Sequence, residues 1–331
     1  MALAGGGDRV GDVSVVIATY KRPHLIERAL DSVARQTVRP AEILVVDDCS
    51  RDHTEDVVRA WSERMAIPIR FVRMERNGGA GAARNRAMAL AGQAYVAFLD
   101  SDDEYLPNAL EVLLEPLSLY PDAVVSFADA RIVSDGRLLP DMLMSRALPS
   151  EACAPTDHVE IRRLKDPVET LLLTSMIPAC AAAFRRDAAV AVGLMPEYRF
   201  GEDWLFWLRL SSRGDFLCRF APVARVHRQD DNLTGDASVA EASAQVLRGL
   251  LALLSGQAGV PLEERHKALL QAAIGDQTRI WRYQRSRLGL SRYIRALRGE
   301  VGRMTGGAFA HLRSDPKSLL RAVLSGGRRS R

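Results

Sequence analysis

Cysteine is scarce in this sequence, and its spacing argues against two common uses of the residue. The 331 residues include four cysteines, Cys49, Cys153, Cys180 and Cys218, and none of them forms a CxxC pair. Zinc sites and disulfide frameworks both rely on cysteines at close or regular spacings. The sequence therefore predicts neither, and a reducing compartment suits it best.

Long hydrophobic runs are also missing. No segment approaches the roughly 18 uninterrupted apolar residues that a membrane-spanning helix needs. The start, MALAGGGDRVGD, lacks the basic and then apolar pattern of a signal peptide. We therefore expect a cytoplasmic protein in which residues 1–12 are flexible. With 47% hydrophobic and 26% charged residues, the remainder is expected to bury a sizeable core.

Acidic residues are scarce near the carboxyl end. Residues 279–331 contain fourteen Lys and Arg but two acids, so they carry a net charge of +12, whereas residues 1–278 carry −8. Leu290, Tyr293, Ile294 and Leu297 form an apolar stripe with arginines beside it. Such a segment can lie on an anionic membrane surface, which would make the protein peripheral at the inner face of the membrane.

The alternative is an arginine face on a helix packed against the body, and we expect packing with weak membrane contact. No recognisable nucleic-acid reader motif accompanies the charge, so no nucleic-acid partner is expected.

The chain does contain a regular alternation of strand and helix patterns. Four apolar runs, each followed by a helical pattern, are predicted to be strands: Val13–Thr19, Ile43–Val46, Ile69–Arg73 and Tyr95–Leu99. This order predicts βαβ units and a mainly parallel sheet. Two more strands are expected at 123–129 and 179–184, a loop or lid at 132–166, and helices from about residue 238 onward.

Polar residues follow each of the first four strands. They are Thr19 after the first, Asp47 and Asp48 after the second, Asn77 and Gly78 after the third, and Asp100 and Asp102 after the fourth. In open α/β sheets, ligands bind just outside the carboxyl ends of the strands. The pattern therefore predicts one site, to which four consecutive strands contribute.

The fourth strand ends in the acidic run DSDDE, residues 100–104. The spacing of Asp100 and Asp102 suits a divalent ion such as Mg or Mn, which binds oxygen ligands and keeps room for water or substrate phosphate. Alternatively, Asp102 caps a helix that begins near Leu106, and Asp103 and Glu104 meet its positive end. The acids by themselves favour neither interpretation strongly.

Three further stretches carry candidate chemistry. NGGAGAARNR, residues 77–86, could cradle phosphate before a helix, or form a turn followed by a helix packed closely on the sheet. In FGEDWLFWLRL, residues 200–210, Glu202 and Asp203 either cap an apolar helix or include a general base whose pKa the neighbouring aromatics raise. His227 follows a short strand-like run, and a lone histidine is more often structural than a ligand.

Taken in order, these motifs resemble the family 2 glycosyltransferases with a GT-A fold. The matching segments are ATYKR (18–22), VVDDCSRDHT (45–54), NGGAGAARN (77–85), FLDSDD (98–103) and GEDWLFWLRL (201–210). Two small departures from the commoner pattern are Cys49 and Ala18. The resemblance covers about residues 13–232.

The resemblance implies roles for particular residues. Nucleotide-sugar contacts are implied for Thr19, Arg22, Asp47, Asp48, Asn77, Gly79, Arg84, Asp100 and Ser101. Asp100 and Asp102 match the DxD motif that grips the diphosphate through a Mn or Mg ion, and His227 falls where many members have a histidine near the metal. Asp203 matches the catalytic base, with Glu202 beside it near the acceptor.

The expected architecture is therefore a GT-A domain at residues 13–235 with a mainly parallel nucleotide-binding sheet flanked by helices. It comprises a nucleotide-sugar half (13–130) and an acceptor half (131–235), and a helical basic extension (236–331) follows. The implied activity is inverting, metal-dependent transfer from a nucleoside-diphosphate sugar, with uridine as the favoured base. The acceptor would be a saccharide or lipid-linked hydroxyl in polysaccharide or glycoconjugate assembly. A nucleotidyltransferase and a non-catalytic nucleotide-sugar-binding scaffold are the alternatives.

Overall fold

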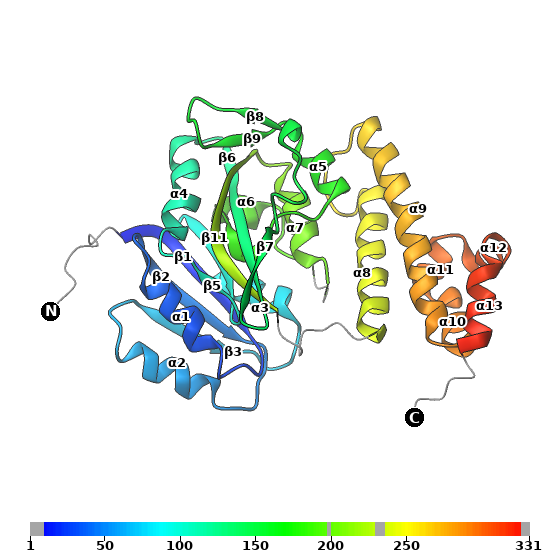
Figure 1. Ribbon diagram of the computed structural model, residues 1–331, viewed down its shortest axis with the longest axis horizontal. Coiled ribbons are helices and arrows are strands. Elements are labelled where there is room, and N and C mark those ends of the chain that lie inside the picture. Colours follow the sequence, from blue (N-terminus) through cyan, green and yellow to red (C-terminus); the bar gives the residue numbers. More distant parts are fainter. Residues whose placement is uncertain (1–9, 197–199, 229–235, 326–331) are drawn as a thin grey trace. The chain divides into compact units, whose positions relative to one another are not determined.

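The computed structural model describes residues 10–196, 200–228 and 236–325, and the side chains of 236–239 are left aside. The chain divides into two compact units, Met1–Asp230 and Asp231–Arg331. The first contains every strand of the described chain, and the second is helical (Figure 1).

The first unit begins with the expected alternation of strands and helices. Its elements run β1 (Val10–Thr19), α1 (Ile26–Ala34), β2 (Arg39–Asp47), α2 (Thr54–Ser62), β3 (Ile69–Arg73), α3 (Ala80–Leu90), β4 (Tyr95–Asp100), β5 (Glu104–Tyr105) and α4 (Ala109–Leu119). The second half contains β6 (Ala123–Ser134), β7 (Arg137–Met142), β8 (Cys153–Pro155), β9 (Arg162–Leu164), α5 (Pro167–Leu173), β10 (Ala182–Arg185), α6 (Arg186–Ala191), α7 (Glu202–Leu210) and β11 (Asp215–Arg228).

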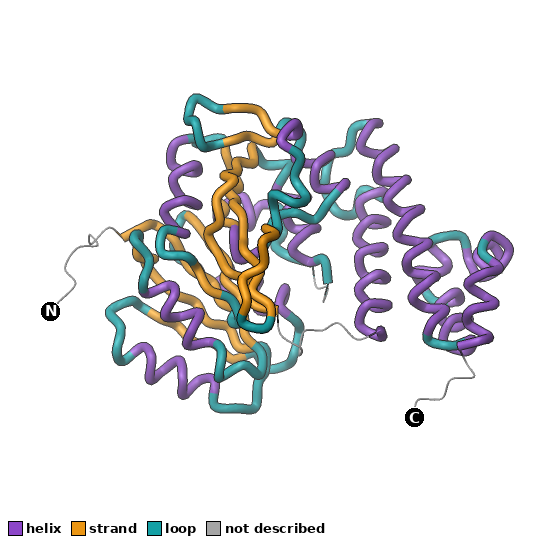
Figure 2. Tube along the Cα trace, in the orientation of Figure 1, coloured by secondary structure: helices purple, strands orange, loops and turns teal. Residues whose placement is uncertain are grey.

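These strands form one mixed sheet (Figure 2). The order is β3-β2-β1-β4-β10-β6-β11-β9-β8, with β7 on β6 and β5 on β11. Strands β1 to β4 are parallel, β10 lies antiparallel between β4 and β6, and β6 is parallel to β11. The carboxyl ends of the first four strands therefore meet at one edge of the sheet, as the sequence predicts.

The two faces of the sheet bury different side chains. Because side chains alternate along a strand, Val13, Val15 and Ile17 face one side and pack with the apolar residues of α1, α2 and α4. On β4, Phe98 belongs to an aromatic cluster with Phe184. This aromatic cluster determines where the catalytic candidates lie.

Three expectations about local structure are wrong. Residues 132–166 are not a bare loop, because β6 continues to Ser134 and β7, β8 and β9 follow. The helix after the acidic run begins at Ala109, not near Leu106, and Glu104 belongs to a short strand instead. Residues 10–12 belong to β1; the rest of the predicted flexible start, residues 1–9, lies outside the described residues.

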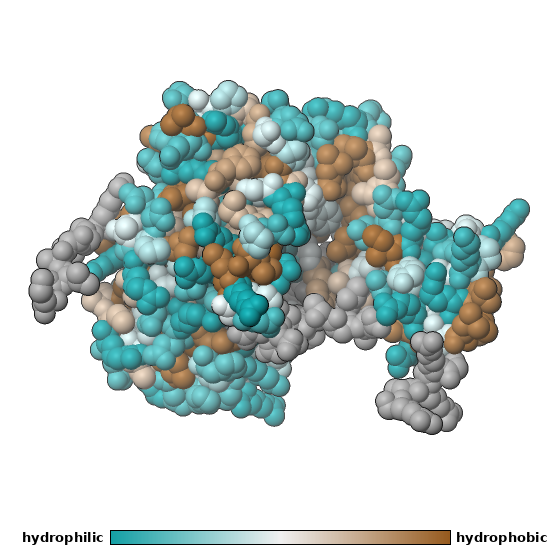
Figure 3. All heavy atoms as spheres, viewed as in Figure 1, coloured by the Kyte–Doolittle hydropathy of each residue, from teal (hydrophilic) through white to brown (hydrophobic). Residues whose placement is uncertain are grey.

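The second unit is built from helices around its own small core. The helices are α8 (Asp236–Leu254), α9 (Glu264–Arg287), α10 (Leu290–Arg298), α11 (Glu300–Met304), α12 (Gly307–Ser314) and α13 (Pro316–Ser325). Leu247, Trp281, Tyr293 and Leu297 are buried in its core. Hydrophobic side chains also gather on the surface over α13 (Figure 3). None of the helices in the described residues is long and apolar enough to cross a membrane.

Candidate active site

An aromatic cluster brings the end of β4 to the start of α7. The ring of Phe98 lies 5.0 Å from that of Phe184 and 6.3 Å from that of Trp207, and Phe206 packs 5.2 Å from Phe184. Asp100 follows Phe98 by two residues, so both side chains point to the same face of the strand. This face is the one that α7 covers, and the acids at the start of α7 are therefore held near Asp100.

Arg84 joins these two acidic segments. This residue of α3 is 5% exposed, and its guanidinium donates to Asp100 Oδ1 at 2.5 Å and to Glu202 Oε1 at 3.2 Å. Its guanidinium carbon also lies 5.4 Å from the centre of the Phe98 ring. Burial opposes the charge on Arg84, but Asp100 and Glu202 outweigh it and raise the pKa of Arg84. The buried cation therefore stays charged and shared between the DxD motif and the α7 acids.

The Gly81 position lets α3 approach α7 closely. A Cβ at this position would lie 3.0 Å from Cγ of Glu202 and 3.3 Å from the carbonyl oxygen of Pro196. Only a residue without a side chain leaves that space free. The glycine at position 81 thus allows close packing of α3 on α7, a contact that neither interpretation of the glycine-rich stretch names.

The acids of α7 differ in their surroundings. Glu202 is 7% exposed, and burial followed by repulsion from Asp203 raises its pKa to about 7, despite the opposing effect of Arg84. Asp203 is partly buried and its Oδ1 accepts a hydrogen bond from the backbone N–H of Trp204 at 2.8 Å. Burial raises the pKa of Asp203, while Arg84 and backbone hydrogen bonds lower it in part. Both carboxyl groups therefore hold a proton more readily than an exposed acid.

Asp102 pairs with Arg22, a residue of the loop after β1. Burial, followed by repulsion from Asp100, raises the pKa of Asp102, and Arg22 opposes this. Arg28 of α1 donates to the backbone carbonyl of Asp102 and so anchors the acidic turn. Ser101 is buried between the two acids.

His227 lies beside the acidic run, but its ring contacts Glu104. Nε2 of His227 is 3.1 Å from Glu104 Oε1, and its backbone N–H donates to Asp103 Oδ1 at 3.0 Å. Asp103 and Glu104 therefore fix β11 and do not meet the start of a helix, so the capping interpretation of these acids is wrong. As a metal ligand, His227 stays a prediction.

Asp48 holds the glycine turn after β3. Its two carboxylate oxygens accept the backbone N–H groups of Gly78 at 2.7 Å and Gly79 at 2.8 Å, and Asn77 donates to the Asp48 carbonyl at 3.2 Å. Gly79 has φ 87°, which favours glycine. The N–H groups of Gly78 and Gly79 are thus bonded to Asp48.

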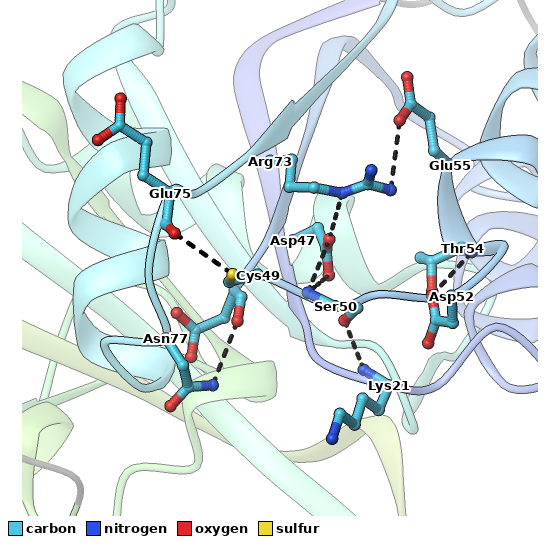
Figure 4. A network of polar contacts seen from close by, with 11 residues as sticks. Lys21, Asp47, Cys49, Ser50, Asp52, Thr54, Glu55, Arg73, Glu75 and Asn77 are labelled. Carbon is cyan, nitrogen blue, oxygen red and sulfur yellow. Dashed lines mark hydrogen bonds and ion pairs between the residues drawn. The ribbon is translucent and has the colours of Figure 1, made fainter.

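Asp47 is completely buried and supports the adjacent loop (Figure 4). Its carboxylate accepts hydrogen bonds from the N–H of Ser50 at 3.1 Å and from Arg73 Nε at 3.0 Å. Ser50 in turn accepts the backbone N–H of Lys21 at 2.7 Å, so the loops after β1 and β2 are tied together. In contrast, the buried hydroxyl of Thr19 has no hydrogen-bond partner within residues 10–196, 200–228 and 236–325.

Asp100 and Asp102 supply carboxylate oxygens, the type of ligand that a hard divalent cation takes. In the described part of the chain, no three His, Cys, Asp or Glu side chains are arranged to hold a metal ion by themselves. However, repulsion from Asp100 contributes to the raised pKa of Asp102, although each acid also pairs with an arginine, Arg84 and Arg22 respectively, so a nearby cation would still favour the charged form of Asp102. A hard cation can take its remaining ligands from water and substrate phosphate.

Several residues shape this site through contacts that the sequence does not indicate. Arg28, Asp103 and Glu104 position the acidic run through the contacts described above. Asn85 exchanges two hydrogen bonds with the backbone of Met195, at 2.8 and 2.9 Å, and so ties α3 to the segment before α7. Asn85 lies within the motif NGGAGAARN, but nothing in the spacing of this motif indicates a partner 110 residues away.

The family profile described as "Glycosyl transferase family 2" matches residues 14–193. The chain belongs to glycosyl transferase family 2. This confirms the family that the motifs indicate. The match runs from within β1 to just beyond α6 and includes both DxD acids, while the motif at 201–210 lies outside it.

Curated relatives agree with this family. Over 100 residues, 30% of the chain, the sequence is 38% identical to the UDP-Glc:α-D-GlcNAc-diphosphoundecaprenol β-1,3-glucosyltransferase WfgD of Escherichia coli, covering 38% of that protein. In the first two curated relatives, the segment that this chain matches spans about two fifths of each protein's length.

Two solved structures have the same fold. One is S. aureus TarS 1–349 in complex with UDP-GlcNAc, with a TM-score of 0.60 and 19% identity over 95% of this chain and 89% of TarS 1–349. The other is the mannosyltransferase PcManGT of Pyrobaculum calidifontis in complex with GDP-Man and Mn²⁺, with a TM-score of 0.55 and 16% identity over 95% and 86%. The expected GT-A fold is confirmed.

Proposed function

We propose that this member of family 2 is an inverting, metal-dependent glycosyltransferase that moves a sugar from a nucleoside diphosphate to an acceptor hydroxyl. The observation that carries the proposal is the Arg84 bridge, which holds Asp100 of the DxD motif and Glu202 of the α7 acids on one guanidinium. A donor diphosphate bound at Asp100 and an acceptor bound beside Glu202 would then be neighbours. Such proximity is what group transfer requires.

At the donor end, Asp100 and Asp102 would hold Mn or Mg together with the diphosphate. The bound metal would act as a Lewis acid that stabilises negative charge on the departing nucleoside diphosphate. Arg22, now paired with Asp102, is placed to move onto a phosphate oxygen once a cation takes its place. The unsatisfied hydroxyl of Thr19 supports a polar contact with the donor at the end of β1.

Five residues would support the nucleotide pocket and not simply contact the nucleotide sugar: Asp47, Asp48, Asn77, Gly79 and Arg84. Their polar groups already bind one another or neighbouring residues, so we propose that they shape the nucleotide pocket mainly by holding its loops.

At the acceptor end, Asp203 would take the proton from the attacking hydroxyl. Its raised pKa suits a general base that works near neutral pH. Glu202 beside it would stay paired with Arg84 and hold the start of α7 in place. Attack on the face opposite the leaving group is a single displacement, which inverts the anomeric carbon.

We further propose a uridine donor and a saccharide or lipid-linked acceptor in polysaccharide or glycoconjugate assembly. The support is that WfgD is named as using UDP-Glc and a diphosphoundecaprenol acceptor, and that TarS was solved with UDP-GlcNAc. A peripheral position at a membrane would bring the enzyme to such an acceptor. Exposed apolar side chains of the second unit, among them Phe309 (81% exposed) and Leu324 (68%), together with its exposed basic residues, suit that position.

The test is turnover with Mn²⁺, UDP-Glc or UDP-GlcNAc, and a lipid-diphosphate saccharide, with the product anomer assigned by NMR. We expect UDP release and an inverted linkage. Asp203→Asn should lower kcat by about 10²–10⁴-fold and leave donor affinity nearly unchanged, because the base acts on the acceptor. An Asp122→Asn variant, with an exposed acid changed outside the site, is the matched control.

The alternatives give different products. A nucleotidyltransferase would release pyrophosphate, and a binding scaffold would bind donor without turnover. Loss of donor binding in a folded Asp203→Asn variant would contradict the division of roles between the two acidic segments.

A further inference from the structure

The helical unit contains an arginine-lined pocket that belongs to no motif of the family. Side chains of α8, α9 and α10 line a cavity of about 310 Å³, with Trp281 among them. A second cavity, of about 490 Å³, lies along α10 and shares Arg295 and Gly299 with the first. Cavities of about 300–1,000 Å³ are the usual size of small-ligand sites.

The lining of the two cavities is strongly basic. Five arginines take part: Arg248, Arg285, Arg292, Arg295 and Arg298. Two acids oppose them. Glu300 is 3.2 Å from Arg248 Nε, and Glu241 is 2.9 Å from Arg285 Nη2. The pocket therefore keeps an excess of three positive charges.

The excess charge is concentrated on one helix. The side chains of Arg292, Arg295 and Arg298 are exposed, and none forms an ion pair with any acid in the described part of the chain. At spacings of three residues they lie on neighbouring positions of one side of α10. The opposite side is fixed, because Tyr293 and Leu297 are fully buried in the core of this unit.

We propose that this pocket binds a diphosphate group. Guanidinium groups bind phosphate oxygens through paired, charge-assisted hydrogen bonds, and arginine presents them in a planar geometry that lysine lacks. A ligand with two or more negative charges matches the excess of three positive charges, and the combined volume admits more than one phosphate. The group could come from a soluble diphosphate or from the head of a phosphorylated lipid.

No residue of this pocket belongs to the proposed donor site. It consists entirely of residues 244–301, outside the family match at 14–193, and its cations need no metal to attract an anion. The inference therefore stands whether or not the proposed transfer reaction is correct.

The experiment is isothermal titration of the full chain with inorganic pyrophosphate in EDTA. EDTA removes divalent metal. Without metal, the acidic DxD segment repels pyrophosphate, so binding at the proposed donor site is suppressed. We expect one binding site per chain in the native protein. Arg292→Ala/Arg295→Ala should weaken binding at least about tenfold, because each change removes charge-assisted hydrogen bonds. Circular dichroism verifies that the helices remain folded.

The matched control is Arg313→Ala/Lys317→Ala. It removes the same charge from exposed positions of α12 and α13 outside the pocket, and binding should stay within about twofold of the native value. Equal weakening in both variants would mean diffuse attraction and would overturn the proposal, as would no binding by the native chain.

Vesicle flotation distinguishes the source of the phosphate. If vesicles with diacylglycerol pyrophosphate bind the native chain, pyrophosphate competes, and the pocket variant alone loses binding, the ligand is a lipid diphosphate. If pyrophosphate binds in the pocket and these vesicles bind no better than phosphatidylcholine vesicles, the ligand is a soluble diphosphate. Both results support a diphosphate pocket.

Discussion

Arg84 neutralises two carboxylates at once, so its removal should leave both Asp100 and Glu202 without their shared partner. We predict that Arg84→Met lowers the free energy of unfolding by about 3–5 kcal/mol, the usual effect of breaking a buried ion pair from one side. Urea denaturation measures this change. Arg86→Met, at an exposed position of the same helix, should change it by less than about 0.5 kcal/mol. Equal stability of the two variants would show that the bridge contributes nothing.

Glu202 should make stability depend on pH. Its pKa is about 7 in the folded chain against a usual 4.5, so the folded state binds this proton more tightly than the unfolded state does. The contribution is present below pH 4.5 and is lost as the pH rises through about 7. Between pH 5 and pH 8 the native chain should lose on the order of 2–3 kcal/mol relative to Glu202→Gln.

Denaturation at both pH values checks this, with exposed Glu160→Gln as the control that should follow the native chain. A constant difference between the native chain and Glu202→Gln across this range would be evidence that Glu202 titrates normally.

The approach of α3 to α7 depends on Gly81. A valine there would meet the Glu202 side chain and the Pro196 carbonyl, and overpacking of this kind costs about 1–3 kcal/mol. We predict that Gly81→Val lowers Tm and also kcat, because the acids of α7 move relative to Asp100. Gly275→Val is the matched control, since a Cβ at this position of α9 meets no atom within 4 Å. A kcat unchanged in Gly81→Val would separate helix packing from catalysis.

The main elements of the sheet could be predicted because long apolar runs and helical repeats are strong signals. Parallel order then places Thr19, Asp48 and Asp100 at one edge of the sheet without further information. The short strands β8 and β9 could not be found, because three residues are too few to show alternation.

Partners across the site were equally hidden from the sequence. Arg84 and Glu202 are separated by 118 residues, and helical periodicity does not say which face of α3 meets α7. The resemblance implies a nucleotide contact for Arg84, and its bridge between two acids is what the sequence does not indicate. The same holds for Asp47, whose partners Ser50 and Arg73 lie on different segments.

The second unit is a folded helical body, which changes how its role should be tested. Deleting residues 279–331 would remove Trp281, Tyr293 and Leu297 and so destroy its core. Surface substitutions avoid this. We predict that Phe309→Ser/Leu324→Ser reduces co-sedimentation with anionic liposomes several-fold at low salt, since both apolar side chains are more than half exposed.

Val159→Ser/Leu173→Ser is the control for that experiment. It removes two similarly exposed apolar side chains from the first unit (79% and 66% exposed) and should leave co-sedimentation unchanged. Equal loss in the two variants, or no loss in either, would contradict a membrane contact through the second unit.

The central claim is a metal-dependent nucleotide site at the DxD motif, and isothermal titration of the chain with UDP tests it most directly. We predict binding with Mn²⁺, little or none with EDTA, and at least a tenfold loss in Asp102→Asn, because the cation loses one of its two proposed carboxylates. GDP and dTDP, titrated in the same way, identify the base. Equal UDP affinity with Mn²⁺ and with EDTA, unchanged in Asp102→Asn, would contradict the account.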